Sequence, residues 1–193
     1  MASVDISDKV ATITIDDCAK LSGHAEQAGR SLRDAIAQCG DRDDVKAIVL
    51  RTTGPNFCAA SDASGSGVPA WWNEVYAGST GLYQSLCYSK KITITAVQGQ
   101  CADAGSLLVL CSDLTIAESG ATFASPFHTM PEANFVLAAL TMRLNRAKTW
   151  MLGGVPLDAK TALGAGLINR IAKKDVLAEA LEMAKSAAKI PLD

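Results

Sequence analysis

The sequence of 193 residues lacks the features that mark several common classes of protein. It contains no apolar run long enough to cross a membrane. Its beginning, MASVDISDKV, has no basic segment followed by an apolar one, as a signal peptide would. The formal net charge is −2 with both signs scattered, so no basic face is offered to nucleic acid or to an anionic membrane. We therefore expect no nucleic acid and no membrane among its partners, and a cytoplasmic location.

Motifs for metals and cofactors are also missing. The six cysteines include no C-x-x-C pair, and without a secretory signal we expect them to be reduced and mostly buried. The two histidines, His24 and His128, lie far apart and show no metal-ligand spacing. The sequence has no phosphate-binding loop of the G-x-x-x-x-G-K-S type and no dinucleotide fingerprint. It thus predicts an enzyme or binding protein without a metal or a separate cofactor.

What is present is a globular composition, 49% hydrophobic and 20% charged, in a chain long enough for one domain with a real core. Strand patterns occur at 10–15, 46–51, 92–97, 113–117 and 167–171. Helical patterns occur at 24–39, 71–88, 134–152 and 175–189, with shorter helices from about Ala104 and after a capping Asp158, the latter stopped by Gly164 or Gly166. Strands and helices alternate throughout, which predicts an α/β domain.

Two turns of small residues follow predicted strands. They are FCAASDAS at 57–64 and GQCADAG at 99–105. In open α/β sheets ligands bind at the carboxyl ends of strands, and small side chains let a ligand approach the backbone N–H groups. Two such N–H groups from different turns would form an oxyanion hole, and the second turn also opens a helix with its unsatisfied donors.

Four stretches in order carry a resemblance to a known family. They are VATITIDDCAKLSGH (10–24), DDVKAIVLRTTGPNFCAASDAS (43–64), AVQGQCADAGSLLVLCSDLTIA (96–117) and GGVPLDAKTALGAGLINRI (153–171). Together they resemble the crotonase superfamily, the enoyl-CoA hydratase/isomerase family, over roughly residues 4–185. The resemblance implies a crotonase-like ββα spiral fold. It also implies a homotrimer or a dimer of trimers, and a coenzyme A thioester as substrate, so that coenzyme A enters as part of the substrate.

The resemblance also implies roles for particular residues. The thioester carbonyl would lie between the backbone N–H groups of Ala59 and Ala104. The residues expected to bind coenzyme A or substrate come from two loops: Cys18, Lys20, Leu21, Ser61 and Asp62. Trp71 and Trp72 fall where the family shapes its acyl pocket, and they imply a bulky or cyclic acyl group, unless they serve helix packing or a trimer contact.

The sequence departs from the family pattern at the acid and base positions. Hydratases of this family use two glutamates to position and protonate water, and these positions fall here at Leu107 and Phe127. Neither side chain can transfer a proton, which argues against ordinary enoyl-CoA hydration. If the alignment is shifted by five residues, Glu132 takes the second position.

Three residues are candidates for proton transfer. Asp103 flanks the second turn, where it could serve as a base or orient water, or where it could simply cap the helix that begins at Ala104. His128 neighbours the lost glutamate position and could transfer protons at cellular pH. Both His128 and Glu132 could instead be ordinary loop residues.

We therefore expect one crotonase-like domain over residues 1–193, with the C-terminal helical cover usual in the family short or absent. The expected reaction is a non-standard hydration, an isomerisation, a decarboxylation or a C–C hydrolysis of an acyl-CoA, because all four develop negative charge on the same thioester oxygen. The alternative is a coenzyme A-binding pseudoenzyme or one subunit of a hetero-oligomer.

Overall fold

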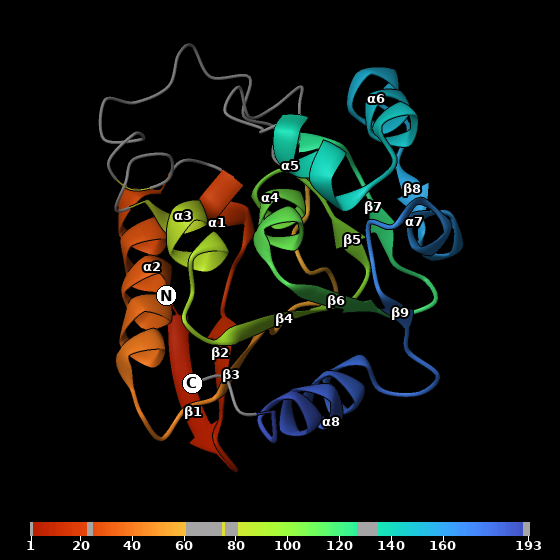
Figure 1. The fold of residues 1–193 in the computed structure, drawn as a ribbon. Helices are drawn as coiled ribbons and strands as arrows, with labels where there is room; N and C mark the ends of the chain where they lie inside the picture. Colours follow the sequence, from red (N-terminus) through yellow and green to blue (C-terminus); the bar gives the residue numbers. More distant parts are fainter. Residues whose placement is uncertain (1, 23–24, 61–74, 76–80, 127–134, 191–193) are drawn as a thin grey trace.

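Strands and helices alternate along the chain, as the sequence predicts (Figure 1). The structure is a computed structural model, and it describes residues 2–22, 25–60, 75, 81–126 and 135–190. The strands in these residues are β1 (Ala2–Ser7), β2 (Val10–Ile15), β3 (Ala47–Thr52), β4 (Ile92–Val97), β5 (Gln100–Cys101), β6 (Leu114–Ala117), β7 (Thr122–Phe123), β8 (Leu157–Asp158) and β9 (Arg170–Ile171). The helices are α1 (Ala19–Ser22), α2 (Glu26–Asp41), α3 (Leu82–Cys87), α4 (Ala104–Cys111), α5 (Phe135–Thr141), α6 (Leu144–Gly153), α7 (Ala159–Ala165) and α8 (Val176–Ala187).

A six-stranded sheet in the order β1-β2-β3-β4-β6-β9 forms the centre of the fold. All neighbours pair in parallel except β1, which runs antiparallel to β2. The four residues from Ala47 to Leu50 in β3 are completely buried, as expected for a continuous apolar strand covered on both faces. Because β2, β3 and β4 are parallel neighbours, their carboxyl ends meet at one edge of the sheet, where the two small-residue turns begin.

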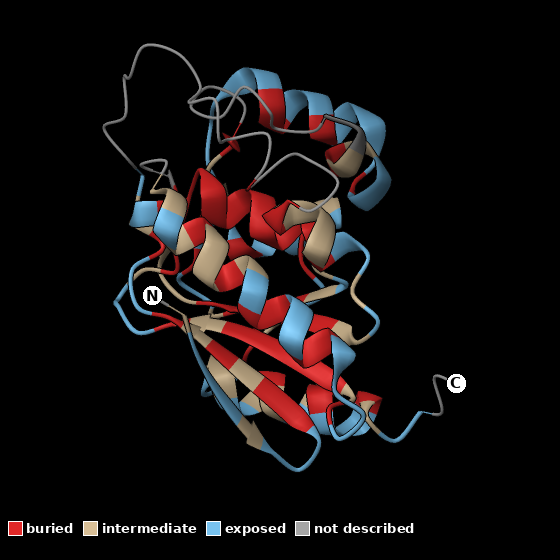
Figure 2. Ribbon diagram, turned by 90° about the vertical axis from the view of Figure 1, so that its left-hand side faces the viewer, coloured by how far each residue is buried: buried red, intermediate tan, exposed pale blue. Residues whose placement is uncertain are grey.

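Helices cover both faces of this sheet. On one face α2, α3 and α4 bury a large apolar cluster that includes Ile13, Ile48 and Leu108. On the other face α8 packs its buried alanines, Ala180 and Ala184, against the opposite side of the strands. Figure 2 shows the buried residues concentrated in the sheet and in α4, while the outer sides of the helices are exposed. The helix that starts at the second turn is therefore the most deeply enclosed one on its face, and all eight of its residues are buried.

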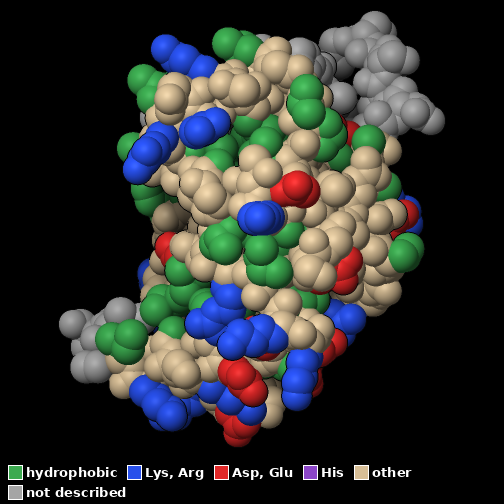
Figure 3. All heavy atoms as spheres, turned by 90° about the vertical axis from the view of Figure 1, so that its right-hand side faces the viewer, with side chains coloured by type: hydrophobic (Ala, Val, Ile, Leu, Met, Phe, Trp, Pro, Cys, Tyr) green, Lys and Arg blue, Asp and Glu red, His purple; other side chains and the backbone are tan. Residues whose placement is uncertain are grey.

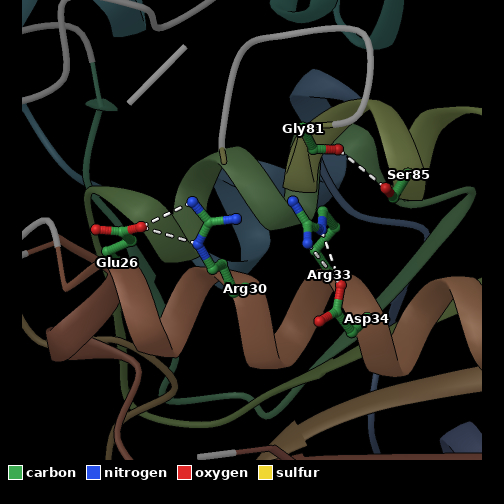
Figure 4. A network of polar contacts seen from close by, with 6 residues as sticks. All are labelled: Glu26, Arg30, Arg33, Asp34, Gly81 and Ser85. Carbon is green, nitrogen blue, oxygen red and sulfur yellow. Dashed lines mark hydrogen bonds and ion pairs between the residues drawn. The ribbon is translucent and has the colours of Figure 1, made fainter. Parts of the chain in front are cut away.

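The outer layer beside α4 is formed by α2 and α3. Figure 4 shows Arg30 and Arg33 on the side of α2 that faces α3, Arg30 paired with Glu26 and Arg33 paired with Asp34. In α3 the Ser85 hydroxyl donates to a main-chain carbonyl at the start of the helix, 3.0 Å away. Apolar side chains such as Leu86 and Ile36 belong to the buried cluster where α2 packs on α3.

The sequence analysis missed β1 and the small sheet β5-β7-β8. Strand β1 is joined to β2 by the two-residue turn Asp8–Lys9, and both residues have positive φ, 51° and 66°. Such turns usually carry Asn-Gly or Asp-Gly, so the Asp-Lys pair gives no hairpin signal. The strands of the small sheet have two residues each in the described chain, which is too short for a recognisable alternation.

The helix expected over 134–152 is two helices in the structure. Helix α5 ends at Thr141 and α6 begins at Leu144, with Arg143 in an extended conformation between them. Of the helix expected over 71–88, the described residues show α3 alone, and most of 71–80 lies outside them.

The predicted capping of α7 is confirmed. Asp158 accepts a hydrogen bond from the Thr161 N–H at 2.6 Å, and Gly166 ends the helix with a φ of +88°. Gly164, the other candidate stop, lies inside the helix. Helix α8 begins in the same way, because Asp175 accepts from the Ala178 N–H at 2.6 Å.

Candidate active site

The two turns of small residues meet at the carboxyl edge of the sheet. Cys58 in the first turn pairs in parallel with Cys101 in the second. The Cys58 N–H donates to the Gln100 carbonyl and the Ala102 N–H donates to the Cys58 carbonyl, both at 2.9 Å. The two turns are therefore joined side by side by backbone hydrogen bonds.

Polar side chains that the sequence analysis did not single out hold the first turn in place. The amide of Gln98 donates to the hydroxyl and the carbonyl of Thr52 at 2.8 and 3.2 Å, and to the Gly54 carbonyl at 2.9 Å. The side-chain oxygen of Asn56 accepts from the Gln100 N–H at 2.8 Å. These bonds satisfy loop backbone groups and fix the distance between the two turns.

Gly105 brings the start of α4 against the first turn. A Cβ at this position would lie 2.4 Å from the Cβ of Cys58, 3.2 Å from the Phe57 ring and 3.3 Å from the sulfur of Cys101. Real Cβ atoms do not approach one another so closely, so only glycine fits here. The first turn of α4 is thus locked onto the loop that follows β3.

Asp103 has a backbone conformation that favours glycine. Its φ is +47° and its ψ is −118°, and the Gly105 N–H donates to the Ala102 carbonyl across the turn at 2.9 Å. These angles belong to the second residue of a type II′ turn, a position where glycine is the usual residue. Asp103 is nevertheless only 3% exposed. Strained backbone of this kind is concentrated at functional sites, where the surrounding structure maintains it.

The helix-cap explanation of Asp103 is wrong. Asp103 does stand directly before the first residue of α4, but its side chain makes no capping hydrogen bond to the helix. Its positive φ also differs from the extended conformation of ordinary capping residues.

The two expected oxyanion donors lie on the joined turns. Ala104 is the fully buried first residue of α4, and the ψ of Asp103 sets the direction of its N–H group. Ala59 follows Cys58 directly and is half-buried, and within the described part of the chain its N–H donates no hydrogen bond. The amino end of α4 carries the positive end of the helix dipole, which favours negative charge beside it.

The expected coenzyme A loop borders the first turn. A cleft of about 170 Å³ runs between the loop that includes Asp16 and Cys18 and the turn from Pro55 to Ala59. Lys20 is exposed on α1 and lies 3.8 Å from the carboxylate of Asp17. Cys18 also lines this cleft and is 3% exposed, and Leu21 is buried in the core.

The thiols of Cys18, Cys58 and Cys101 lie together beside the joined turns. Hydrogen bonding to Cys58 and burial raise the pKa of the Cys18 thiol well above its usual value, and burial raises that of Cys101. Both therefore remain protonated and act as small packing groups. All six cysteines are free, and five are buried as expected, while Cys87 is exposed.

Leu107, the residue expected at the first glutamate position of the family, is an apolar side chain in α4 and is 2% exposed. Several predicted site residues lie outside the described residues: Ser61, Asp62, Trp71, Trp72, Phe127, His128 and Glu132. Asp113, at the start of β6, has a structural position, because it accepts from the N–H and the hydroxyl of Thr93 at 2.8 Å.

Neither a candidate metal cluster nor a candidate membrane span occurs among the described residues. Their His, Cys, Asp and Glu side chains form no group of three that could hold a metal ion. No helix among them is long and apolar enough to cross a bilayer.

Comparison with known proteins identifies relatives over almost the whole chain. The sequence model of the family described as enoyl-CoA hydratase/isomerase matches residues 5–193. "Probable enoyl-CoA hydratase EchA14" of Mycobacterium tuberculosis is 31% identical over 200 residues, which cover 97% of this chain and 75% of the relative. The 1,2-epoxyphenylacetyl-CoA isomerase of Escherichia coli is 27% identical, with 94% of this chain and 74% of the relative covered.

Solved structures show the same fold. The enoyl-CoA hydratase EchA8_6 of Mycobacterium marinum matches with a TM-score of 0.81 at 24% identity, covering 99% of this chain and 93% of that one. A second match, from Silicibacter pomeroyi, has a TM-score of 0.82 at 25% identity and covers 100% of this chain and 84% of that one. The expected crotonase-like fold is therefore confirmed.

Proposed function

Because the chain belongs to the enoyl-CoA hydratase/isomerase family, we propose that it binds an acyl-CoA thioester and stabilises an enolate-like intermediate at the joined turns. The observation that carries this proposal is the type II′ turn at Asp103, locked onto the first turn through Gly105 and the pairing of Cys58 with Cys101. A turn with this strain and this close packing supports a role in directing backbone N–H groups at a ligand.

In the proposed site the thioester oxygen accepts hydrogen bonds from the N–H groups of Ala59 and Ala104. These bonds strengthen as negative charge develops on the oxygen, so they favour the transition state over the bound substrate. Each donor of this kind contributes about 3–4 kcal/mol to transition-state stabilisation. The adjacent helix start adds a favourable dipole.

We assign proton transfer to Asp103, with His128 and Glu132 as the other candidates. The Asp103 carboxylate removes a proton from the carbon next to the thioester carbonyl, and the electron pair of that C–H bond becomes the enolate, with its charge on the thioester oxygen. Returning the proton to another carbon, or letting a leaving group depart, completes the reaction. The burial of Asp103 beside the amino end of α4 supports this role, since low solvent access strengthens electrostatic interactions.

Leu107 favours a reaction other than two-glutamate hydration. An apolar side chain that is 2% exposed cannot position water, so we propose isomerisation, decarboxylation, C–C hydrolysis or a non-standard hydration. Relatives with diverse printed names support this breadth: one is the 1,2-epoxyphenylacetyl-CoA isomerase, and another, 26% identical, is the 4-chlorobenzoyl coenzyme A dehalogenase-2 of an Arthrobacter.

The cleft beside the first turn is the proposed route for coenzyme A. Cys18 and Ala59 are among the residues that line it, and Lys20 lies on the adjoining helix α1 with an exposed side chain. We propose that Lys20 contributes positive charge to the coenzyme A phosphates, that Ser61 and Asp62 contact coenzyme A or the substrate, and that Trp71 and Trp72 contact the acyl group.

The experiment follows a panel of thioesters in D₂O by mass spectrometry, using purified protein with straight-chain enoyl, aromatic enoyl, cyclic β-keto and saturated acyl-CoA. The saturated butyryl-CoA reports enolate formation directly, because each exchange replaces hydrogen by deuterium on the carbon beside the carbonyl. Exchange or conversion that Asp103→Asn abolishes supports the proposal. Loss of carbon dioxide, gain of water or an isomeric product then identifies the reaction class.

The second candidate function is a coenzyme A-binding pseudoenzyme or a subunit of a hetero-oligomer, which the buried Leu107 favours. In that case calorimetry detects binding of coenzyme A, while no thioester exchanges deuterium or changes mass. Exchange by the chain alone would contradict this second candidate.

We also propose that the chain forms a homo-oligomer, a trimer or a dimer of trimers. Large apolar side chains are exposed on and beside α6 and α7, among them Leu144, Leu152, Val155 and Leu163. Figure 3 shows the face of the molecule on which these helices lie, with hydrophobic side chains scattered between basic ones. Burying these side chains in an assembly would remove apolar surface from water, and light scattering on the eluted protein measures the mass of the assembly.

A further inference from the structure

Two cysteines outside the proposed active site are brought together by the fold. Cys87 is the last residue of α3 and is exposed, and Cys111 is the last residue of α4 and is 6% exposed. Helices α3 and α4 pack side by side (Figure 1). Their carboxyl ends therefore place one accessible thiol beside one sheltered thiol.

The start of β4 holds these two helix ends in register. Only four residues, 88–91, separate Cys87 from Ile92, the first residue of β4. Directly after Cys111, the Ser112 hydroxyl lies 2.6 Å from the hydroxyl of Thr95, a residue of the same strand.

Asp113 adds a second connection to the same strand. Its carboxylate accepts from the N–H and the hydroxyl of Thr93, both at 2.8 Å, and its own N–H donates to that hydroxyl at 3.0 Å. The segments that follow both cysteines are thus anchored within the first four residues of β4, which limits how far the two sulfurs can separate.

The two thiols also differ in reactivity. A hydrogen bond from the Cys111 thiol stabilises the Cys87 thiolate and lowers the pKa of Cys87 below its usual value, while the same contact and burial raise the pKa of Cys111. An accessible cysteine with a favoured thiolate next to a second cysteine is the usual arrangement of thiols that respond to oxidants. The buried Cys18, Cys39 and Cys101 have raised pKa values and lack this reactivity.

We propose that Cys87 and Cys111 form a reversible disulfide in exchange with a low-molecular-mass disulfide such as oxidised glutathione. The Cys87 thiolate attacks one sulfur of the oxidant, forms a mixed disulfide and releases one glutathione thiolate. Cys111 gives its proton to water, and its sulfur then attacks the sulfur of Cys87 and expels the second glutathione thiolate. The two protein thiols lose two electrons in total, and the oxidant gains them as two glutathione molecules.

This link closes the chain segment 87–111, which contains β4, β5 and the turn at Asp103. Oxidation therefore cross-links the helix that begins at the proposed oxyanion turn to its neighbour α3. The proposal does not depend on the proposed function, because its readout is the mass and the thiol count of the protein.

The test incubates the full chain in buffers with increasing ratios of oxidised to reduced glutathione. Free thiols are then alkylated in denaturant, and the protein is analysed by mass spectrometry. We expect the protein to lose two hydrogens and two alkylatable thiols, with no glutathione retained. Cys58 shares a tryptic peptide with Cys87, and Cys101 shares one with Cys111. Trypsin is therefore combined with cleavage before Asp62 and Asp103 to show that the linked fragments contain Cys87 and Cys111.

Variants separate the two steps. Two variants, Cys111→Ser and Cys111→Ala, lack the second thiol and have different packing demands. In both, we expect the reaction to stop at the mixed disulfide, with one glutathione bound to Cys87. Cys87→Ser is expected to show neither adduct nor cross-link, and the matched control Cys39→Ser is expected to form the cross-link like the unaltered chain. Glutathione retained on Cys87 of the unaltered chain, a cross-link through another cysteine, or six alkylatable thiols at every ratio would each overturn the proposal.

Discussion

The starts of α4 and α7 have the same kind of residue in the same position and use it differently. Asp158 before α7 has a φ of −71° and accepts a hydrogen bond from the Thr161 N–H, so it satisfies one of the open donors of its helix. Asp103 before α4 has a φ of +47°, is buried, and makes no such bond. The Asp158 residue is exposed to solvent, whereas Asp103 lies where the two small-residue turns join.

The difference shows what each carboxylate contributes. At α7 the aspartate stabilises the helix, and removing it costs folding free energy. At α4 the backbone conformation itself costs free energy, because glycine would adopt it with less strain. This contrast is what the proposed catalytic role of Asp103 would explain.

The largest expected effect is on catalysis by Asp103→Asn. Removing the charge while keeping the shape should lower kcat/KM by roughly 10²–10⁴-fold, the range for loss of a general base. Deuterium exchange into butyryl-CoA, followed by mass spectrometry, measures this. Asp158→Asn is the matched control and should leave the exchange rate unchanged. Equal loss in both variants would mean that stability, and not chemistry, is being measured.

The next largest effect is on stability by Gly105→Ala. The added Cβ would meet the Cβ of Cys58 at 2.4 Å, and both atoms are fixed to backbone, so we expect a loss of about 1–3 kcal/mol in the free energy of unfolding. Denaturant titration measures it. The control Gly164→Ala lies inside α7 with nothing within 4 Å, and should be neutral or stabilising by up to about 1 kcal/mol. A Gly105→Ala protein as stable as the original would show that the two turns are not packed as described.

A smaller loss is expected for Asp175→Ala. It removes the side-chain oxygen that accepts from the Ala178 N–H at 2.6 Å, so α8 should lose about 1 kcal/mol. Thermal unfolding by circular dichroism measures the change. Asp175→Asn, which keeps a capping oxygen, should restore most of it, and failure of this rescue would show that the hydrogen bond is not the stabilising contact.

The smallest effect concerns pH. The hydrogen bond from the Thr161 N–H lowers the pKa of Asp158 below its usual value. The folded state therefore gains stability from the ionised carboxylate at neutral pH and loses it as the pH falls below about 4. Asp158→Asn keeps the cap but cannot titrate, so its melting temperature should fall less between neutral and acid pH. Parallel acid curves for the two proteins would contradict this.

Much of the fold could be predicted from the sequence because the central strands carry strong patterns. Strands β2, β3, β4 and β6 were expected almost at their observed positions, since their residues alternate or form continuous apolar runs. Strand β1 was not expected. Its turn residues Asp8 and Lys9 have positive φ values although neither is glycine, so the sequence contains no signal for the hairpin.

The location of the candidate site could be predicted from the sequence, but the geometry of its backbone could not. Small residues after two strands indicated where a ligand would bind, and the resemblance assigned Ala59 and Ala104. The contact of Gly105 with Cys58 depends on which strands are neighbours, which the sequence does not state. The strain at Asp103 was hidden because an aspartate before a helix has the pattern of an ordinary cap.

The central claim, that Asp103 is present for chemistry, is tested most directly with Asp103→Gly. One preparation is used to measure the melting temperature and the rate of deuterium exchange into butyryl-CoA. Glycine relieves the strain at φ +47°, so the account predicts a melting temperature no lower than that of the original protein together with an exchange rate at least about 100-fold slower. A less stable protein that exchanges deuterium at the original rate would contradict it.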